Sequence, residues 1–195
     1  IFWADGPEGP FLPFESKLPH TPMGQMCLDG TLWVENGTPY MVYCHEWVEM
    51  MDGTMELVEL KPDLSGTVGQ PIRLFCASAA EWSTGSLRED GTRTYVTDGC
   101  FLYRTQTGKL LMIWSSFKNG EYAIGIAESM TGKVFGPWKQ QKEPLFDKHG
   151  GHGMIFKTFD GRLCVVLHAP NSPGGAERAH IFEIEDLGHT LKLKE

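Results

Sequence analysis

The chain has 195 residues and a formal net charge of −8, with 41% hydrophobic and 22% charged residues. This composition is ordinary for a globular protein of one domain and excludes a disordered chain. An acidic chain does not attract a phosphate backbone by its net charge, so a nucleic-acid partner is not expected. The longest apolar run, 110–114, is far short of the roughly 20 residues that cross a bilayer, so no membrane partner is expected either.

The five cysteines are an odd number, and no two of them form a CxxC pair. A zinc knuckle and a fully paired disulfide framework are therefore both poorly supported. Cys44 and Cys164 lie inside apolar runs, where a cysteine is most simply a small hydrophobic residue of the core.

The predicted strands follow a pattern that occurs three times along the chain. Each unit begins with a polar residue followed by glycine, at Asp29, Asp98 and His152. An apolar strand, a glycine-containing turn and a second apolar strand come next, with the turns at 36–37, 107–108 and 160–161. Asn-Gly and Asp-Gly favour hairpins because both residues tolerate positive φ. Each unit therefore predicts a β-hairpin.

More strands follow each hairpin. A third strand is predicted at 55–60, 122–127 and 180–184, and a fourth follows twice, at 72–75 and around Trp138. No stretch predicts an amphipathic helix of ten or more residues. Four short strands per unit are typical of a β-propeller blade. A plain β-sandwich is the alternative, but it would not restart the same pattern three times.

A second repeated phrase, Gly-Pro followed by an aromatic residue, helps to divide the chain. It occurs at 9–11, 20 residues before Asp29, and at 136–138, 16 residues before His152. We therefore expect residues 1–22 to be the tail of an earlier blade, followed by blades at 23–82, 83–146 and 147–195. Propellers close with roughly four to eight blades. The chain begins with Ile1, and we expect an incomplete all-β propeller that lacks its N-terminal blade or blades.

The polar-Gly pairs mark the expected site. The innermost strands of a propeller converge on its central axis, so residues at the same edge of successive inner strands meet in space. Asp29, Asp98 and His152 occupy that edge. Two carboxylates and an imidazole around one axis repel unless they serve acid–base chemistry or are neutralised by a cation. The alternative is that each Asp-Gly only makes a turn at the start of a strand.

Several phrases resemble the glycoside hydrolase family 43 enzymes. They are CLDGTLWVENGTPYMVY, VTDGCFLYRTQTGKLLMIWSS, EYAIGIAESMTGKVFGPW and GGHGMIFKTFDGRL with LHAPN, and their order and spacing carry the resemblance over nearly the whole chain. The resemblance implies a five-bladed β-propeller that hydrolyses arabinose- or xylose-containing plant polysaccharides or oligosaccharides, usually with inversion. It also implies a bacterial enzyme, periplasmic or secreted.

The resemblance implies roles for the two carboxylates. Asp29 matches the aspartate that orients the general acid and adjusts its pKa. Asp98 stands at the position of the general acid, in TDGC where the family commonly has EGP. Because Asp is one methylene shorter than Glu, either Asp98 serves as the acid in a variant subfamily or activity on ordinary substrates is poor. Glu81 is a weaker alternative acid. The general base would belong to a blade outside this chain.

The resemblance also suggests a central cation. His152 matches a central histidine that often lies beside a bound Ca²⁺ or its water shell. Calcium prefers oxygen ligands, so His152 would act on it through water. The alternative is a neutral histidine that is hydrogen-bonded inside the funnel.

Four further residues are candidates for binding substrate. Trp47 and Phe117 follow inner hairpins and could form a stacking floor for a sugar, or they pack between blades. His168 ends a hairpin strand and is either a sugar contact or a structural histidine. Arg178 could neutralise the acidic centre and hold a sugar hydroxyl, or it pairs with Glu177 at the surface.

The sequence thus predicts an inverting glycoside hydrolase with a carbohydrate substrate. Completing the propeller would need the missing N-terminal blades or another chain. A non-catalytic carbohydrate-binding or scaffold propeller is the alternative of a different class, and a related enzyme acting on fructosides or mannosides is a third.

Overall fold

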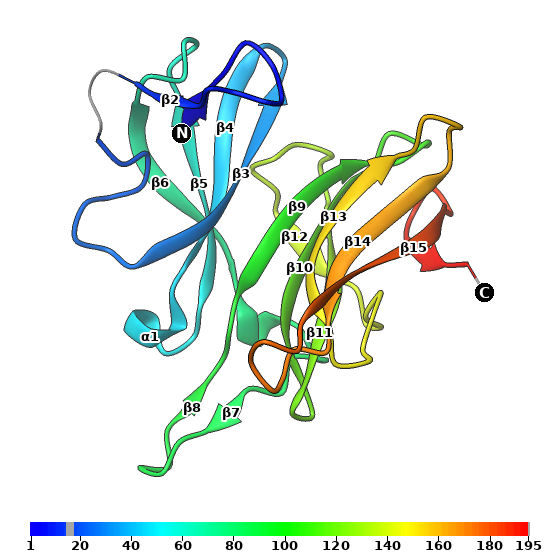
Figure 1. Ribbon diagram of the computed structural model, residues 1–195. Coiled ribbons are helices and arrows are strands. Elements are labelled where there is room, and N and C mark those ends of the chain that lie inside the picture. Colours follow the sequence, from blue (N-terminus) through cyan, green and yellow to red (C-terminus); the bar gives the residue numbers. More distant parts are fainter. Residues whose placement is uncertain (15–17, 195) are drawn as a thin grey trace.

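Three four-stranded antiparallel sheets stand side by side in the computed structural model, which describes residues 1–14 and 18–194 (Figure 1). The first sheet contains β3 (Cys27–Glu35), β4 (Thr38–His45), β5 (Thr54–Leu60) and β6 (Thr67–Cys76). The second contains β9 (Asp98–Arg104), β10 (Leu110–Lys118), β11 (Glu121–Ser129) and β12 (Trp138–Gln140). The third contains β13 (Gly151–Lys157), β14 (Leu163–Ala169), β15 (Arg178–Asp186) and β16 (Leu191–Leu193).

The remaining elements are short. They are the β1 (Phe2–Trp3) and β2 (Leu12–Pro13) hairpin, the β7 (Ser86–Leu87) and β8 (Arg93–Thr94) hairpin, the helix α1 (Trp47–Met50) and a 3₁₀ turn at Ala77–Ala79. The all-β prediction is confirmed, and so are the strands that were predicted in each unit. The prediction missed β16, because its three residues carry too little apolar pattern to mark a strand.

The hairpin turns take the backbone conformation that their sequences predict. At the first turn, both Asn36 and Gly37 have positive φ, at 52° and 83°. At the other two turns only the glycine does, with φ of 85° at Gly108 and 87° at Gly161. A glycine therefore supplies the left-handed residue in all three hairpins.

The two Gly-Pro-aromatic phrases share a local structure as well as a sequence. Gly9 and Gly136 have φ of 80° and 81°. The aromatic ring two residues later folds back in each case, so that an added Cβ would lie 3.1 Å from Phe11 Cδ2 and 2.6 Å from Trp138 Cδ1. Each phrase therefore requires glycine for both its backbone angle and its space.

The two larger clusters of buried residues form layers on either side of the second sheet, and a smaller cluster lies on the outer face of the first sheet. Alternate residues of β10 face opposite sides, so Met112 and Trp114 pack toward the first sheet, while Leu111 and Ile113 pack toward the third. All four side chains are fully buried. A strand that is buried on both faces has a continuous apolar sequence, which explains the LLMIW run. Cys44 lies in the first layer and Cys164 is also buried, as expected for core cysteines.

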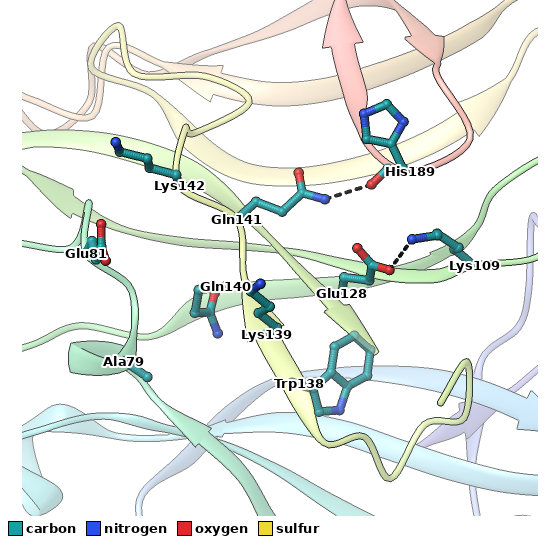
Figure 2. Close-up of a pocket in the computed structure, with 10 residues that line it drawn as sticks. All are labelled: Ala79, Glu81, Lys109, Glu128, Trp138, Lys139, Gln140, Gln141, Lys142 and His189. Carbon is teal, nitrogen blue, oxygen red and sulfur yellow. Dashed lines mark hydrogen bonds and ion pairs between the residues drawn. The ribbon is translucent and has the colours of Figure 1, made fainter. Parts of the chain in front are cut away.

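A groove of about 760 Å³ runs along the outer edge of the second sheet, beside β12 (Figure 2). Trp138 and its neighbours on β12 form one wall. Glu81 reaches the groove from the loop after the 3₁₀ turn, and His189 reaches it from the β15–β16 turn. The Lys109 ammonium pairs with the Glu128 carboxylate across its end at 2.5 Å. At least two of the charged side chains that line the groove therefore form an ion pair with each other.

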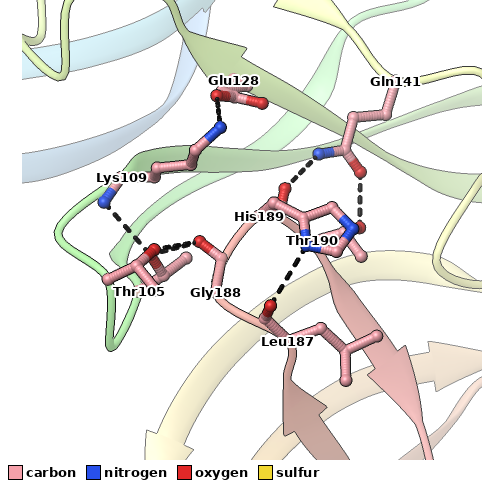
Figure 3. Close-up of polar contacts among 9 residues, drawn as sticks. Thr105, Lys109, Glu128, Gln141, Leu187, Gly188, His189 and Thr190 are labelled. Atoms are coloured by element: carbon pink, nitrogen blue, oxygen red, sulfur yellow. Dashed lines mark hydrogen bonds and ion pairs between the residues drawn. The ribbon is translucent and has the colours of Figure 1, made fainter.

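Polar contacts at the same edge hold the third sheet against the second (Figure 3). Thr105 Oγ1 donates to the Gly188 carbonyl at 2.9 Å, and Gln141 Nε2 donates to the His189 carbonyl at 2.8 Å. Thr190 Oγ1 donates in turn to Gln141 Oε1 at 2.5 Å. These bonds anchor the β15–β16 turn and fix the relative position of the two sheets.

Among the residues described, no helix has the length and apolar character to span a membrane.

Candidate active site

Asp29, Asp98 and His152 come together where the first strands of the three sheets begin. The backbone N–H of Gly99 donates to Asp29 Oδ2 at 3.0 Å, across 70 positions of sequence. His152 Nε2 lies 3.6 Å from the other Asp29 oxygen. We call Asp29, Asp98 and His152 the hub residues. The structure therefore brings together the three residues that the repeat pattern placed at one edge.

A β-bulge in each inner strand turns the hub residues toward one another. The strand register shifts between Leu28 and Thr31 in the first sheet, and equivalent shifts occur at Ile113/Ser115 and Gly151/Met154 in the other two. Positive φ accompanies each bulge, at 55° for Asp29, 50° for Gly99 and 57° for His152. Bulges re-aim side chains in this way, and Gly99 allows His152 to approach closely, because an added Cβ on Gly99 would lie 2.8 Å from the His152 ring.

The Asp98 carboxyl is mostly enclosed and has a single strong donor. Tyr122 O–H donates to Asp98 Oδ2 at 2.8 Å. Burial raises the pKa of Asp98, the Tyr122 hydrogen bond lowers it, and the charge of Asp29 raises it again, so that the pKa lies above its ordinary value. Burial and the neighbouring Asp98 carboxylate also raise the pKa of Tyr122, which keeps the phenol protonated as a donor.

An aromatic row borders the hub. The Phe117 and Tyr122 rings lie 5.1 Å apart, and the Tyr122 and His168 rings stack at 5.5 Å with an interplanar angle of 18°. The His168 ring also lies 6.3 Å from His152. Two candidate substrate residues, Phe117 and His168, are thus next to the hub through Tyr122. His168 Nε2 is held by Asn171 Oδ1 at 2.9 Å.

Two other candidates have different surroundings. Trp47 lies in α1 and carries the Arg88 guanidinium over its ring at 5.3 Å. Arg178 is exposed and donates to the backbone carbonyls of Gly175 and Glu177 in its own loop. The structure does not bring Arg178 to the two aspartates, because its guanidinium satisfies local carbonyls instead. Glu81 is also remote, since it is exposed and lines the outer groove (Figure 2).

Three residues of the site had no assigned role in the sequence analysis. Tyr122 donates to Asp98, and Ser115 Oγ accepts the backbone N–H of His152 at 2.8 Å. Glu46, which follows β4 directly, is only 9% exposed. Burial raises the pKa of Glu46, and Asp98 and Asp29 raise it further. Glu46 could have been found from the sequence, because a charged residue directly follows the apolar strand YMVYCH. Tyr122 gave no such signal, because it lies in an apolar strand and resembles a core residue.

The adjacent His45 belongs to a separate polar cluster. Its Nδ1 lies 3.1 Å from Glu56 Oε1 and its Nε2 lies 3.0 Å from Glu49 Oε2. Burial lowers the pKa of His45, but the hydrogen bonds to the two glutamates outweigh this and raise it overall. His45 therefore acts as a structural histidine that ties α1 to the first sheet.

The predicted Ca²⁺ has no ready-made site among the residues the structure describes. No group of three or more His, Cys, Asp or Glu side chains there is placed to hold a metal ion. His152 and Asp29 offer two donor groups, and Asp98 is already engaged by Tyr122. No step of the chemistry is therefore assigned to calcium, and a central Ca²⁺ stays a prediction.

Comparison with known proteins assigns the chain to a family. The sequence model of Glycosyl hydrolases family 43 matches residues 1–184. The chain belongs to glycosyl hydrolases family 43. The resemblance found in the sequence is thereby confirmed. A search of curated proteins found no significant match.

Solved structures agree with family 43 membership. An endo-arabinase from Bacteroides thetaiotaomicron VPI-5482 is 45% identical with a TM-score of 0.87, over 94% of this chain and 64% of that one. A thermostable family-43 glycoside hydrolase is 24% identical with a TM-score of 0.83, over 100% of this chain and 65% of that one. An endo-1,4-beta-xylanase from Bacteroides thetaiotaomicron VPI-5482 is 21% identical with a TM-score of 0.79, over 98% of this chain and 65% of that one. The family 43 chain described here thus spans about two thirds of the length of these proteins.

Proposed function

We propose that the protein is a glycoside hydrolase that cleaves arabinose- or xylose-containing plant polysaccharides or oligosaccharides by an inverting acid/base mechanism. The observation that carries the proposal is the meeting of Asp29 and Asp98 at one hub, with the pKa of Asp98 raised by burial and by Asp29. Glycosidases need a carboxyl that keeps its proton near neutral pH beside one that is ionised. The 45% identity to a protein described as an endo-arabinase favours arabinan among the substrates.

In this mechanism Asp98 donates its proton to the oxygen of the leaving group as the glycosidic bond breaks. The Gly99 N–H donates to one oxygen of Asp29, and the charge of Asp29 disfavours ionisation of Asp98. A base on the opposite face of the sugar removes a proton from the attacking water. The acid and base carboxyls of inverting enzymes lie roughly 6.5–9.5 Å apart to leave room for that water.

We assign the base to a further blade of a five-bladed propeller, outside this chain. The chain spans 64–65% of three family structures. One face of the third sheet supports a further blade, because Met154, Val166 and Ile181 are cross-strand neighbours there. Met154 and Ile181 are 56% and 64% exposed, and an apolar stripe of this kind is normally covered by another element.

The aromatic row supplies the surface for a sugar. Phe117 and His168 flank Tyr122, which donates its hydrogen bond to the Asp98 carboxyl. Sugar rings have apolar faces that stack on aromatic side chains, while hydroxyls bind polar tips such as the His168 imidazole. We propose that Phe117 and His168 contact the sugar at the cleaved bond, and that Trp47 contacts a more distant unit.

The test is turnover of the full-length protein with arabinan, xylan and aryl glycosides of arabinose and xylose. Asp98→Asn keeps the shape of the side chain but removes the proton donor, and we expect kcat to fall by about 10²–10⁴-fold. Asp160→Asn is the matched control, because Asp160 also precedes a glycine but lies in an exposed turn. Near-wild-type turnover by Asp98→Asn would reject the assignment.

A non-catalytic carbohydrate-binding propeller is the second candidate. It is favoured by the aspartate in place of the family's usual glutamate and by the Tyr122 hydrogen bond, which stabilises the ionised form of Asp98. Calorimetric binding of arabinan oligosaccharides with no release of reducing ends would support this candidate. Release of fructose or mannose from the corresponding polymers would instead indicate the third substrate class.

A further inference from the structure

The β7–β8 hairpin, residues 86–94, projects from the body of the molecule on the same side as α1 (Figure 1). We call this hairpin the arm. The strand β8 is followed closely by Asp98, the first residue of β9, so the arm leads directly into the hub. The helix α1 also lies at the hub, because it follows β4, whose end pairs with the start of β3 next to Asp29. The arm and α1 therefore both border the candidate active site.

The base of the arm is anchored on both sides by backbone hydrogen bonds. On one side, Thr84 N–H donates to the Phe117 carbonyl at 3.0 Å. On the other side, Tyr95 N–H donates to the Met51 carbonyl at 2.9 Å, directly after α1. The arm therefore rises between Phe117 and α1. These are the two places that carry the candidate stacking residues of the sequence analysis, since Trp47 is the first residue of α1.

Arg88 joins the arm to α1 but keeps its hydrogen-bond donors unused. It directly follows β7 and places its guanidinium over the Trp47 ring, 5.3 Å from the ring centroid. Both side chains are half-buried. Within residues 1–14 and 18–194, the Arg88 side chain donates no hydrogen bond and forms no ion pair. Arg93 on the other strand of the arm differs, because its guanidinium donates to the Thr84 carbonyl at 2.6 Å.

A guanidinium stacked on an indole has the chemistry to hold a sugar. Stacking fixes the plane of the guanidinium, and its five N–H donors point outward in that plane. Sugar hydroxyls accept such hydrogen bonds, while the apolar face of a sugar packs on an aromatic ring. Arg88 supplies the donors from the arm, and Trp47 supplies the aromatic surface from α1.

We propose that Arg88 and Trp47 form a distal subsite for a chain of sugar units, in which Arg88 donates hydrogen bonds to a unit that packs on Trp47. The proposal rests on the proposed function and makes a polymer the preferred substrate. The base of the arm is bonded to Phe117, so a chain that leaves the hub past Phe117 meets the arm and α1. A substrate with a single sugar unit occupies the hub and leaves Arg88 unused.

The test compares arabinan with an aryl arabinoside as substrates of the full-length protein. Arg88→Met keeps an unbranched apolar side chain over Trp47 but removes every N–H donor. A hydrogen bond to a charged donor contributes roughly a factor of ten or more to binding. We therefore expect the ratio of kcat/KM for arabinan to kcat/KM for the aryl arabinoside to fall about tenfold, through a higher KM for arabinan.

Arg162→Met is the matched control, because it removes the same charge from an exposed arginine. Arg162 pairs with Asp160 in the turn after β13, at the opposite end of that strand from His152. Its ratio should equal that of wild type. Arg88→Lys keeps the positive charge but replaces the planar guanidinium with a single ammonium group, so it should restore only part of the ratio. An unchanged ratio in folded Arg88→Met, or an equal fall in Arg162→Met, would overturn the proposal.

Calorimetric binding of arabinan oligosaccharides of increasing length separates this proposal from the proposed function, since it does not need turnover. In Asp98→Asn the affinity should grow with chain length, and addition of Arg88→Met should remove most of that gain. Equal affinity for every length in Asp98→Asn would overturn the distal subsite even if wild type is an active hydrolase. A gain that Arg88→Met removes, in a protein without any turnover, would support the subsite and reject the hydrolase.

Discussion

Tyr122→Phe removes a single oxygen atom and should move the alkaline limb of the pH profile to higher pH. The ring stays packed between Phe117 and His168, while the 2.8 Å hydrogen bond to Asp98 and the hydrogen bond between the phenol oxygen and the Ser115 hydroxyl are lost. A hydrogen bond to a charged group contributes about 1.5–3 kcal/mol, and one pKa unit corresponds to about 1.4 kcal/mol. The pKa of Asp98 should therefore rise by about one to two units, because the ionised form loses its donor.

The assay is the kcat profile of the full-length protein between mildly acidic and alkaline pH. The alkaline limb should move to higher pH by about one unit or more. Tyr103→Phe is the control, because Tyr103 O–H donates to Asp186 Oδ2 at 2.9 Å at the other end of β9. A limb that stays in place or moves to lower pH in Tyr122→Phe would refute the role of this hydrogen bond.

The same variant makes a prediction for stability. The pKa of Asp98 in the folded protein is raised, so ionising Asp98 disfavours the fold as pH rises above the ordinary aspartate value. Tyr122→Phe raises this pKa further and should cost more stability at pH 8 than at pH 4. Urea unfolding at the two pH values measures the difference, and equal losses would contradict the expectation.

Two further predictions concern the framework. In Gly125→Ala the new Cβ would lie 2.0 Å from the Trp82 ring between the first two sheets. We therefore expect the free energy of unfolding in urea to fall by about 1–3 kcal/mol or more. Gly174→Ala is the control and should change this free energy little, because Gly174 has open space around it. The pKa of His45 is raised in the folded protein, so protonation of His45 stabilises the fold. This stabilisation is fully present below the ordinary histidine pKa near 6.5 and is lost as pH rises through the raised pKa of the folded protein. His45→Gln should remove that dependence, and an unchanged slope of stability against pH between 6 and 8 would count against it.

Much of the secondary structure was predictable because turn chemistry and apolar alternation are properties of short segments. Asn36-Gly37 predicted a hairpin, and both residues have the positive φ that such a turn needs. The LLMIW run predicted a strand, and the structure shows that β10 is buried on both faces. Strand β16 escaped prediction because only its pairing with β15 stabilises three residues in an extended conformation.

The candidate site was predictable only in part. The repeats aligned Asp29, Asp98 and His152 at one edge, and the structure brings them together. The donor to Asp98 was not predictable, because Tyr122 lies in the apolar segment EYAIGIA and resembles a core residue. The position of Arg178 was not predictable either. Its positive charge suggested that it lies at the acidic centre, but its guanidinium donates to carbonyls of its own loop instead.

By itself, the amino-acid sequence determined three repeated sheets, their turns and the polar residue that begins each unit. Only the tertiary structure decided which donor reaches the Asp29 and Asp98 carboxyls. The reason is that periodicity and turn preference act within a few residues, whereas these contacts depend on how closely neighbouring sheets pack. That spacing is set by the side chains between the sheets, among them Cys44, Cys100 and Trp114, and no single segment of the chain contains it.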